Sequence, residues 1–133
     1  MLESATLALR IPALDLDRAR VWYRDKLGLE PLEERPGGLL YRTRTAEFAI
    51  YQAAAAGSGT FTQAGWYVED LDATVAELRE RGVRFEDVDA PGLRTTDGIA
   101  DVEGNYPSKG RGERAAWFRD SEGNLFGLAQ LVA

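Results

Sequence analysis

The sequence of 133 residues predicts an α+β fold made of two copies of one βαβββ module. The main observation is an internal repeat, because residues 15–19 read DLDRA and residues 70–74, which lie 55 positions later, read DLDAT. Each run follows a segment with strand-like alternation and opens a segment with the apolar spacing of a helix. We therefore expect one domain over residues 1–133, with modules over about 5–56 and about 60–131.

Each predicted helix begins at an aspartate and ends at a glycine. The carboxylates of Asp15 and Asp70 stand where an N-cap accepts a free backbone N–H of the first turn. Gly28 and Gly82 suit the left-handed position that follows a helix. Between these ends, apolar residues recur at helical spacing: Leu16, Ala19, Tyr23 and Leu27 in the first helix, and Leu71, Val75 and Leu78 in the second.

Segments rich in alternating or β-branched residues surround the helices. The expected strands are residues 7–11, 30–33, 39–43 and 47–52 in the first half, and residues 65–68, 83–87, 115–119 and 125–131 in the second. The last two strands of each half form a predicted hairpin. The run Gly57-Ser58-Gly59 is the expected linker between the modules.

Residues 91–112 break the symmetry between the halves. This segment contains five glycines and two prolines and is longer than its counterpart around Pro36-Gly37-Gly38. Loops of this length in compact domains are either functional or disordered. A lid over a site and a disordered loop are equally compatible with the sequence.

The composition excludes several classes of function. A net charge of −6 argues against nucleic acid as a partner, because phosphate contacts need a surplus of Lys and Arg. No apolar run approaches the length of a membrane span, and the acidic N-terminus is unlike a signal peptide. The chain has no Cys and no His, which removes thiolate and imidazole chemistry. We expect a cytoplasmic protein that contacts neither nucleic acid nor membrane.

The repeated motifs resemble those of the vicinal oxygen chelate superfamily, which includes glyoxalases, bleomycin-resistance proteins and extradiol dioxygenases. The similarity covers roughly residues 5 to 131 and is carried by the order and spacing of short motifs. These are DLDRA at 15–19, Trp22-Tyr23, Leu27-Gly28-Leu29, YVEDLD at 67–72, LRERGV at 78–83 and FRDSEGN at 118–124. The resemblance implies mixed sheets that curl into an open cup, with the helices on the outer face.

The resemblance also implies four metal-ligand positions, usually His and Glu, on strands that face the cup. In this sequence the matching positions hold Ala8, Ala49, Gln63 and Gly127. Three of these side chains offer no donor atom, and an amide oxygen is a poor anchor for a first-row divalent metal. We therefore expect neither a metal nor another cofactor at this site.

Alternation along the strands predicts the lining of the cup. Small residues at the cup positions would leave room, and aromatic and polar side chains would surround it. The candidate ligand-binding residues are Arg10, Tyr41, Tyr51, Gln63, Tyr67 and Trp117. A concave site with aromatic walls and a few polar groups is typical of small-molecule binding. Trp and Tyr on strands also serve as core or interface residues, so this alternative stays open.

These features predict a small-molecule-binding protein that takes an aromatic or amphipathic ligand without metal catalysis. A lyase, isomerase or dioxygenase with an atypical metal site or metal-free acid–base chemistry is the alternative. Its candidate carboxylates are Glu47, Asp97, Asp101 and Glu103. A third hypothesis is an interaction domain with a filled cup. The family resemblance implies a homodimer in each case.

Overall fold

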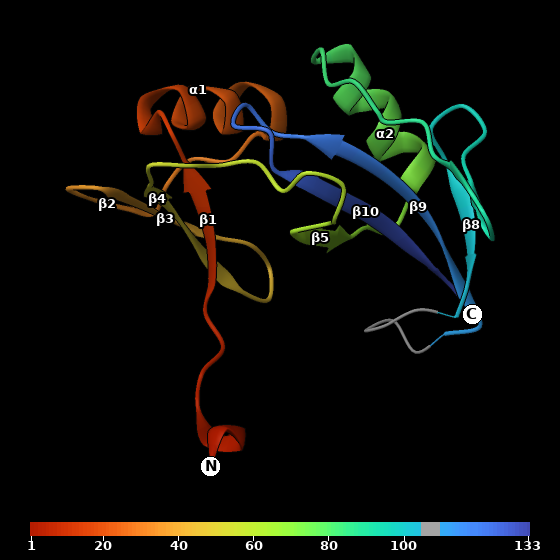
Figure 1. The fold of residues 1–133 in the computed structure, drawn as a ribbon, viewed down its shortest axis with the longest axis horizontal. Helices are drawn as coiled ribbons and strands as arrows, with labels where there is room; N and C mark the ends of the chain where they lie inside the picture. The colour runs from red at the N-terminus through yellow and green to blue at the C-terminus, as the bar shows by residue number, and fades with distance from the viewer. Residues whose placement is uncertain (105–109) are drawn as a thin grey trace.

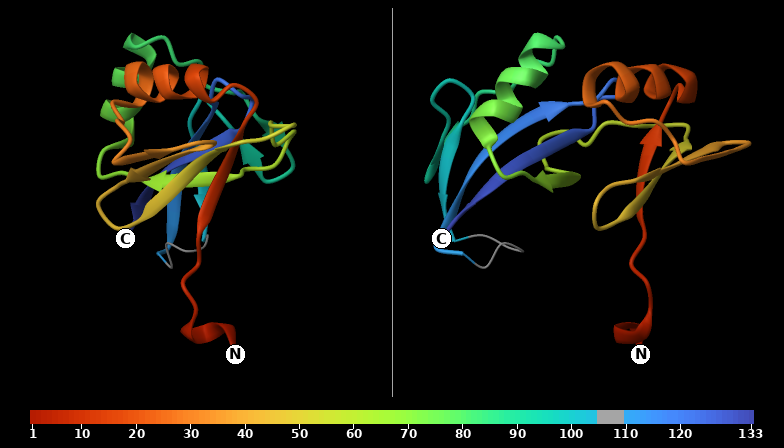
Figure 2. Two further views of the ribbon diagram at one scale, coloured as in Figure 1. Left: turned by 90° about the vertical axis from the view of Figure 1, so that its left-hand side faces the viewer. Right: turned by 180° about the vertical axis from the view of Figure 1, so that it is seen from behind.

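The computed structural model describes residues 1–104 and 110–133, whose strands form two four-stranded sheets and one small hairpin. The elements are η1 (Leu2–Ser4), β1 (Leu9–Ala13), α1 (Leu16–Leu27), β2 (Glu33–Arg35), β3 (Gly38–Arg42), β4 (Glu47–Gln52), β5 (Ala64–Tyr67), α2 (Leu71–Glu80), β6 (Asp89–Ala90), β7 (Leu93–Arg94), β8 (Ala100–Glu103), β9 (Gly112–Arg119) and β10 (Leu125–Val132). Figure 1 shows both helices on one side of the strands, and the views in Figure 2 agree.

The two large sheets repeat one topology. The first has the strand order β1-β4-β3-β2 and the second has the order β5-β10-β9-β8. In each, the strand before the helix pairs in parallel with the last strand of the module, and the other pairs are antiparallel. The chain between the two parallel strands of each module includes a helix, because parallel strands need a long crossover connection. The predicted α+β fold with two βαβββ modules is confirmed.

The helix ends are those that the sequence predicts. The Asp15 carboxylate accepts a hydrogen bond from the backbone N–H of Arg18, and Asp70 accepts one from Ala73, both at 3.0 Å. Gly28 follows α1 with φ 68°, a left-handed conformation that costs glycine little. These caps fix where each chain segment turns from strand into helix and back.

One aromatic core spans both modules on the helix side of the sheets. Tyr23 of α1 is fully buried and contacts Tyr41 and Phe48 of the first sheet and Phe126 of the second. The rings of Phe48 and Trp66 meet edge to face at 6.4 Å. Because such contacts add to the free energy of burial, the core holds the two modules together.

A buried polar cluster at the turn between β9 and β10 reinforces this junction. The Tyr23 hydroxyl donates to the Asp120 carboxylate at 2.7 Å. Asp120 also accepts the backbone N–H groups of Glu122 and Asn124, and the Asn124 amide donates to the Pro12 carbonyl at 3.0 Å. This turn of the second module is therefore bonded to α1 and β1 of the first.

The Glu122 side chain, only 1% exposed, extends the cluster to the start of α1. It accepts hydrogen bonds from Arg18 at 2.8 and 3.0 Å and from the Asp15 backbone N–H at 2.9 Å. Burial alone would raise the pKa of Glu122, but the bonds from Arg18, Asp15 and Ser121 outweigh it and lower that pKa to about 2.

The linker between the modules is part of the same junction. Ser58 is 2% exposed, and its hydroxyl accepts the Leu125 backbone N–H at 2.7 Å. The backbone N–H of Gly57 donates to the Asn124 side-chain oxygen at 3.1 Å. The segment expected as a plain linker is therefore fixed against the first residues of β10.

Two predictions about the connections were wrong. Residues 91–104, expected as part of a long loop, contain β7 and β8, and β8 extends the second sheet by pairing with β9. Residues 105–109 of that loop lie outside the described residues, so neither alternative, a lid or a disordered loop, is tested there. Residues 83–87 do not form a full strand but one bridge, between Phe85 and Phe118.

No described helix is long and apolar enough to cross a membrane.

We predict that Glu122→Gln lowers the free energy of unfolding by about 2 kcal/mol near neutral pH, because it removes a buried charge bonded to Arg18. A depressed pKa in the folded state gives stability that is present above the ordinary value of 4.5 and lost as pH falls toward about 2. Urea unfolding between these pH values measures both effects. Glu80→Gln, on an exposed position of α2, is the control, and an unchanged acid dependence in Glu122→Gln would contradict the account.

Candidate functional site

A cavity of about 430 Å³ lies on the second sheet. Part of its wall is formed by the face turned away from the helices, which we call the cup face. Register places Gly65, Gly127 and Trp117 in one row across β5, β10 and β9, and Tyr67, Ala129 and Ala115 in the next. The described residues that line the cavity are Thr62, Ala64, Gly65, Trp66, Tyr67, Glu113, Ala115, Trp117, Gly127, Leu128 and Ala129.

Missing side chains create the floor of this cavity. A Cβ at Gly65 would lie 3.1 Å from the Gly127 carbonyl oxygen, so a side chain there would crowd the neighbouring strand. A Cβ at Gly127 would lie 3.6 Å from the indole nitrogen of Trp117. Trp117 is partly buried and Tyr67 is 49% exposed, so both rings are accessible from the cavity. The prediction that these two residues share one cup face is confirmed.

Glu113 also lines the cavity, although the strand pattern of the sequence did not predict it there. The predicted strand began at residue 115, whereas β9 begins at Gly112. Extending the same alternation by one step places Glu113 on the face of Ala115 and Trp117. Its side chain lines the cavity and is 5% exposed. A carboxylate is therefore buried in the wall of a largely apolar cavity.

Arg10 and Tyr51 form a separate pair on the cup face of the first sheet. Alternation places both on that face, as predicted. The Arg10 guanidinium carbon lies 4.8 Å from the centre of the Tyr51 ring, a cation–π contact. Neither residue lines the cavity on the second sheet, and Gln63 is partly buried beside that cavity without lining it. The structure thus brings Tyr67 and Trp117 together and leaves the other predicted residues apart from them.

The prediction that Tyr41 faces the cup is wrong. In the register of the β3–β4 hairpin, Tyr41 lies opposite Phe48 and Leu40 lies opposite Ala49, so Leu40 takes the cup face. The Tyr41 ring stacks on Phe48 at 5.1 Å in the core and is fully buried. Its hydroxyl has no hydrogen-bond partner in the described part of the chain, and burial raises the pKa of Tyr41 to about 12.

A family model described as the Glyoxalase/Bleomycin resistance protein/Dioxygenase superfamily matches residues 6–128. The chain belongs to this superfamily. No curated protein matches the sequence with significance. Membership agrees with the duplicated modules and with the motifs that carry the resemblance.

Solved structures of the superfamily share the fold at low sequence identity. The glyoxalase/bleomycin resistance protein/dioxygenase of Alicyclobacillus acidocaldarius aligns with a TM-score of 0.71 at 16% identity, over 98% of this chain and 93% of that one. FosX, a fosfomycin resistance protein of Listeria monocytogenes in complex with Mn(II) and sulfate, gives 0.68 at 14%, over 97% and 91%. TnmS3, an antibiotic-binding protein of Streptomyces sp. CB03234, gives 0.63 at 22%, over 97% and 98%.

The superfamily's metal site does not fit this chain. Ala8 lies just before β1, Ala49 is on the first sheet and Gly127 forms part of the cavity floor. Because these residues are alanine and glycine, none of them has a side-chain donor atom. Gln63 alone has one. In residues 1–104 and 110–133, no group of three or more His, Cys, Asp or Glu side chains is arranged to hold a metal. At the positions that the resemblance assigns to metal ligands, Ala8, Ala49 and Gly127 therefore supply no side-chain donor.

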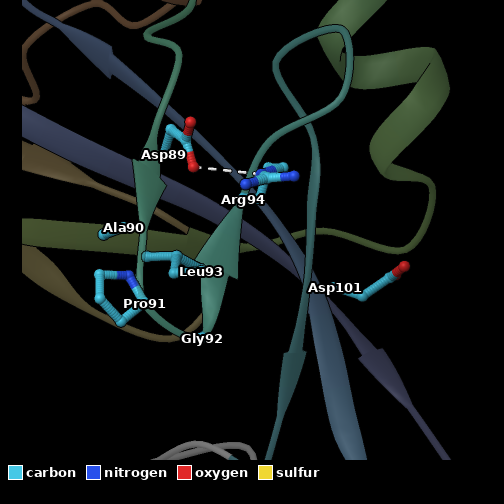
Figure 3. A pocket seen from close by; sticks show the side chains of 7 residues that line it. All are labelled: Asp89, Ala90, Pro91, Gly92, Leu93, Arg94 and Asp101. Atoms are coloured by element: carbon cyan, nitrogen blue, oxygen red, sulfur yellow. Dashed lines mark hydrogen bonds and ion pairs between the residues drawn. The ribbon is translucent and has the colours of Figure 1, made fainter.

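The carboxylates considered for acid–base chemistry lie elsewhere. Glu47 is paired with Arg42 at the end of the first hairpin, and Asp97 lies 3.5 Å from Arg79. Asp101 borders a larger surface hollow of about 700 Å³ beside the β6–β7 hairpin, shown in Figure 3. There Asp89 and Arg94 form an exposed pair at 3.1 Å, and Asp101 points away from it. In the described lining of this hollow, Asp101 is therefore not directed toward the Asp89–Arg94 pair.

We predict that Tyr41→Phe raises the free energy of unfolding by about 1 kcal/mol, because it removes a buried hydroxyl that lacks a partner in the described residues. Urea unfolding measures the change, and Tyr51→Phe on the cup face serves as the control. A loss of stability in Tyr41→Phe would contradict the assignment of this residue to the core.

Proposed function

We propose that this chain is a small-molecule-binding protein that takes an aromatic or amphipathic ligand in the cavity on its second sheet, without a metal at the superfamily's site. The observation that carries the proposal is the pairing of two aromatic rings, Tyr67 and Trp117, with a floor of Gly65 and Gly127. Flat aromatic walls over a floor without side chains suit a planar group, which can stack on the rings.

The size and chemistry of the cavity support this function. A volume of about 430 Å³ is within the range of sites that hold small organic molecules. Its wall is mainly aliphatic and aromatic, and the polar side-chain groups of its described lining are few: the Tyr67 hydroxyl, the indole N–H groups of Trp66 and Trp117, the Glu113 carboxylate and the Thr62 hydroxyl. Such a lining binds by burial of apolar surface and orients the ligand through a few polar contacts.

The comparisons support the proposal at the level of the superfamily. TnmS3 is described as antibiotic-binding and FosX as a fosfomycin resistance protein. One fold therefore serves both binding and resistance in other proteins, and the fold alone does not decide between them. For this chain the lost donor positions favour binding over metal-dependent catalysis. Arg10, Tyr51 and Gln63 stay candidate contacts for a ligand that extends beyond the cavity.

The proposed setting is the cytoplasm, with two copies of the chain in a homodimer. The cytoplasm is supported by the absence of Cys. The homodimer is supported by exposed apolar side chains of the N-terminal segment, where Leu2 is 78% and Leu7 is 97% exposed. Figure 1 shows this segment leaving β1 on the side away from the helices. A second copy would cover these side chains and gain their burial.

We predict a particle of about twice the 14.7 kDa chain mass in size-exclusion chromatography with light scattering. Leu7→Glu, which places a charge in the exposed N-terminal segment, should shift the particle toward the mass of one chain. Glu80→Gln on α2 is the control. A wild-type mass of one chain at micromolar concentration would contradict the homodimer.

The ligand site is tested with 2-(2-naphthyl)ethanol, a neutral amphipathic aromatic probe, by titration calorimetry. We predict that Trp117→Ala weakens its binding about tenfold, since an aromatic wall contributes on the order of 1 kcal/mol beyond its area. Gly127→Leu should weaken binding at least as much, because its side chain would fill the space beside Trp117. Trp22→Phe on α1 is the control.

Two results would contradict this function. One is no binding of the probe by the wild-type protein. The other is equal affinity in the wild type, Trp117→Ala and Gly127→Leu, which would place the probe outside the cavity.

A further inference from the structure

We propose a second binding site, on the helix side of the molecule, for a small aromatic carboxylate. The site is a hollow of about 410 Å³ whose described lining consists of Trp22 of α1, residues 82–86 after α2 and Arg119 of β9. We call it the helix-side hollow. It shares no described lining residue with the cavity on the second sheet, so the proposal does not depend on the function proposed for that cavity.

Two aromatic side chains form part of the wall of the helix-side hollow. Trp22 stacks on Phe118 with ring centres 6.3 Å apart, and Phe85 meets Phe118 edge to face at 5.7 Å. Phe118 is fully buried, whereas Trp22 and Phe85 are only partly buried. The buried core therefore supports two rings whose remaining surface borders the hollow. A planar aromatic group gains apolar burial and ring contacts against such a wall.

Arg84 gives the helix-side hollow its charge. Its described lining has three charged residues, and two of them neutralise each other, because Arg119 donates to the Glu86 carboxylate at 2.8 Å. Arg119 also donates to the carbonyl oxygens of Gly123 and Gly59, so its guanidinium is occupied. Arg84 is exposed and has no hydrogen bond or ion pair within residues 1–104 and 110–133. One positive charge of the described lining thus lacks a counter-charge, which favours an anion.

The charges beyond Trp22 orient the ligand. Trp22 also borders a second hollow, of about 500 Å³, in which the described aspartates outnumber the basic residues. These charged residues are Asp15, Asp17, Asp25, Arg18 and Lys26. An anion is disfavoured on that side by its excess of negative charge. The carboxylate of the ligand is therefore expected beside Arg84, with the aromatic group against Trp22 and Phe85.

Backbone hydrogen bonds hold the wall that carries Arg84. The Val83 N–H donates to the Leu78 carbonyl of α2 at 2.9 Å, and the Glu86 N–H donates to the Trp117 carbonyl of β9 at 2.8 Å. Residues 83–86 are thus fixed at both ends. A site whose walls are already in place loses little conformational freedom when a ligand binds, which favours affinity.

The test compares 2-naphthoate with 2-naphthamide, which share the aromatic group and differ in charge. Titration calorimetry with the wild-type protein should show 2-naphthoate binding about fivefold more tightly, the size of an exposed ion pair. Arg84→Gln should bring the two affinities to within about twofold. Arg35→Gln, which removes the same charge from an exposed position of β2, is the matched control and should keep the fivefold preference.

The location is read from the ¹⁵N-labelled wild-type protein. Addition of 2-naphthoate should move the indole N–H signal of Trp22 and the backbone amides of Arg84 and Phe85, and should leave Gly65 and Gly127 unchanged. An unmoved Trp22 indole overturns the site, wherever else the probe binds.

Three results of the calorimetry also overturn the proposal: no binding of 2-naphthoate, equal affinity of the wild type for both probes, and an unchanged preference in Arg84→Gln. The preference of the wild type must weaken as salt is added, and a preference that does not respond to salt contradicts the role of Arg84. None of these results bears on the cavity on the second sheet, which is tested with the neutral alcohol and Trp117→Ala.

Discussion

The structure depends on the buried hydrogen bonds that the β9–β10 turn makes to the first module. Asp120 and Glu122 are separated from their partners Tyr23 and Arg18 by about a hundred positions, at 97 and 104 residues. Buried carboxylates are costly unless they are fully bonded, and here each accepts several N–H or O–H groups. These hydrogen bonds hold the β9–β10 turn against α1, and this contact positions the second module relative to the first.

The same turn determines how the cavity is built. β9 and β10 leave the turn in fixed register, which sets Trp117 opposite Gly127 and Ala115 opposite Ala129. One face of these strands packs into the shared aromatic core, and the other face forms part of the cavity wall. A site whose walls are held by the core needs little reorganisation when a ligand enters, which favours affinity. The core and the proposed binding site thus use opposite faces of the same two strands.

Local signals in the sequence predicted the fold, because the repeat, the Asp caps and the glycine stops act within a few residues. Alternation also placed Tyr67, Trp117, Arg10 and Tyr51 on the cup faces. It failed for Tyr41, since hairpin register depends on the turn and a slip of one residue exchanges the faces. Glu113 was missed because β9 starts inside a glycine-rich segment. The Asp120 and Glu122 contacts join distant segments, and no local pattern encodes them.

In the proposed function, a ligand binds on the cup face of the second sheet. Backbone amide shifts in an NMR spectrum of the uniformly ¹⁵N-labelled protein test it directly, since Gly65 and Gly127 report from the cavity floor. Addition of 2-(2-naphthyl)ethanol should move these two amides together with that of Trp117, and should leave Tyr51 and the residues of α1 unchanged. Shifts confined to the first sheet or to the helices would contradict the account.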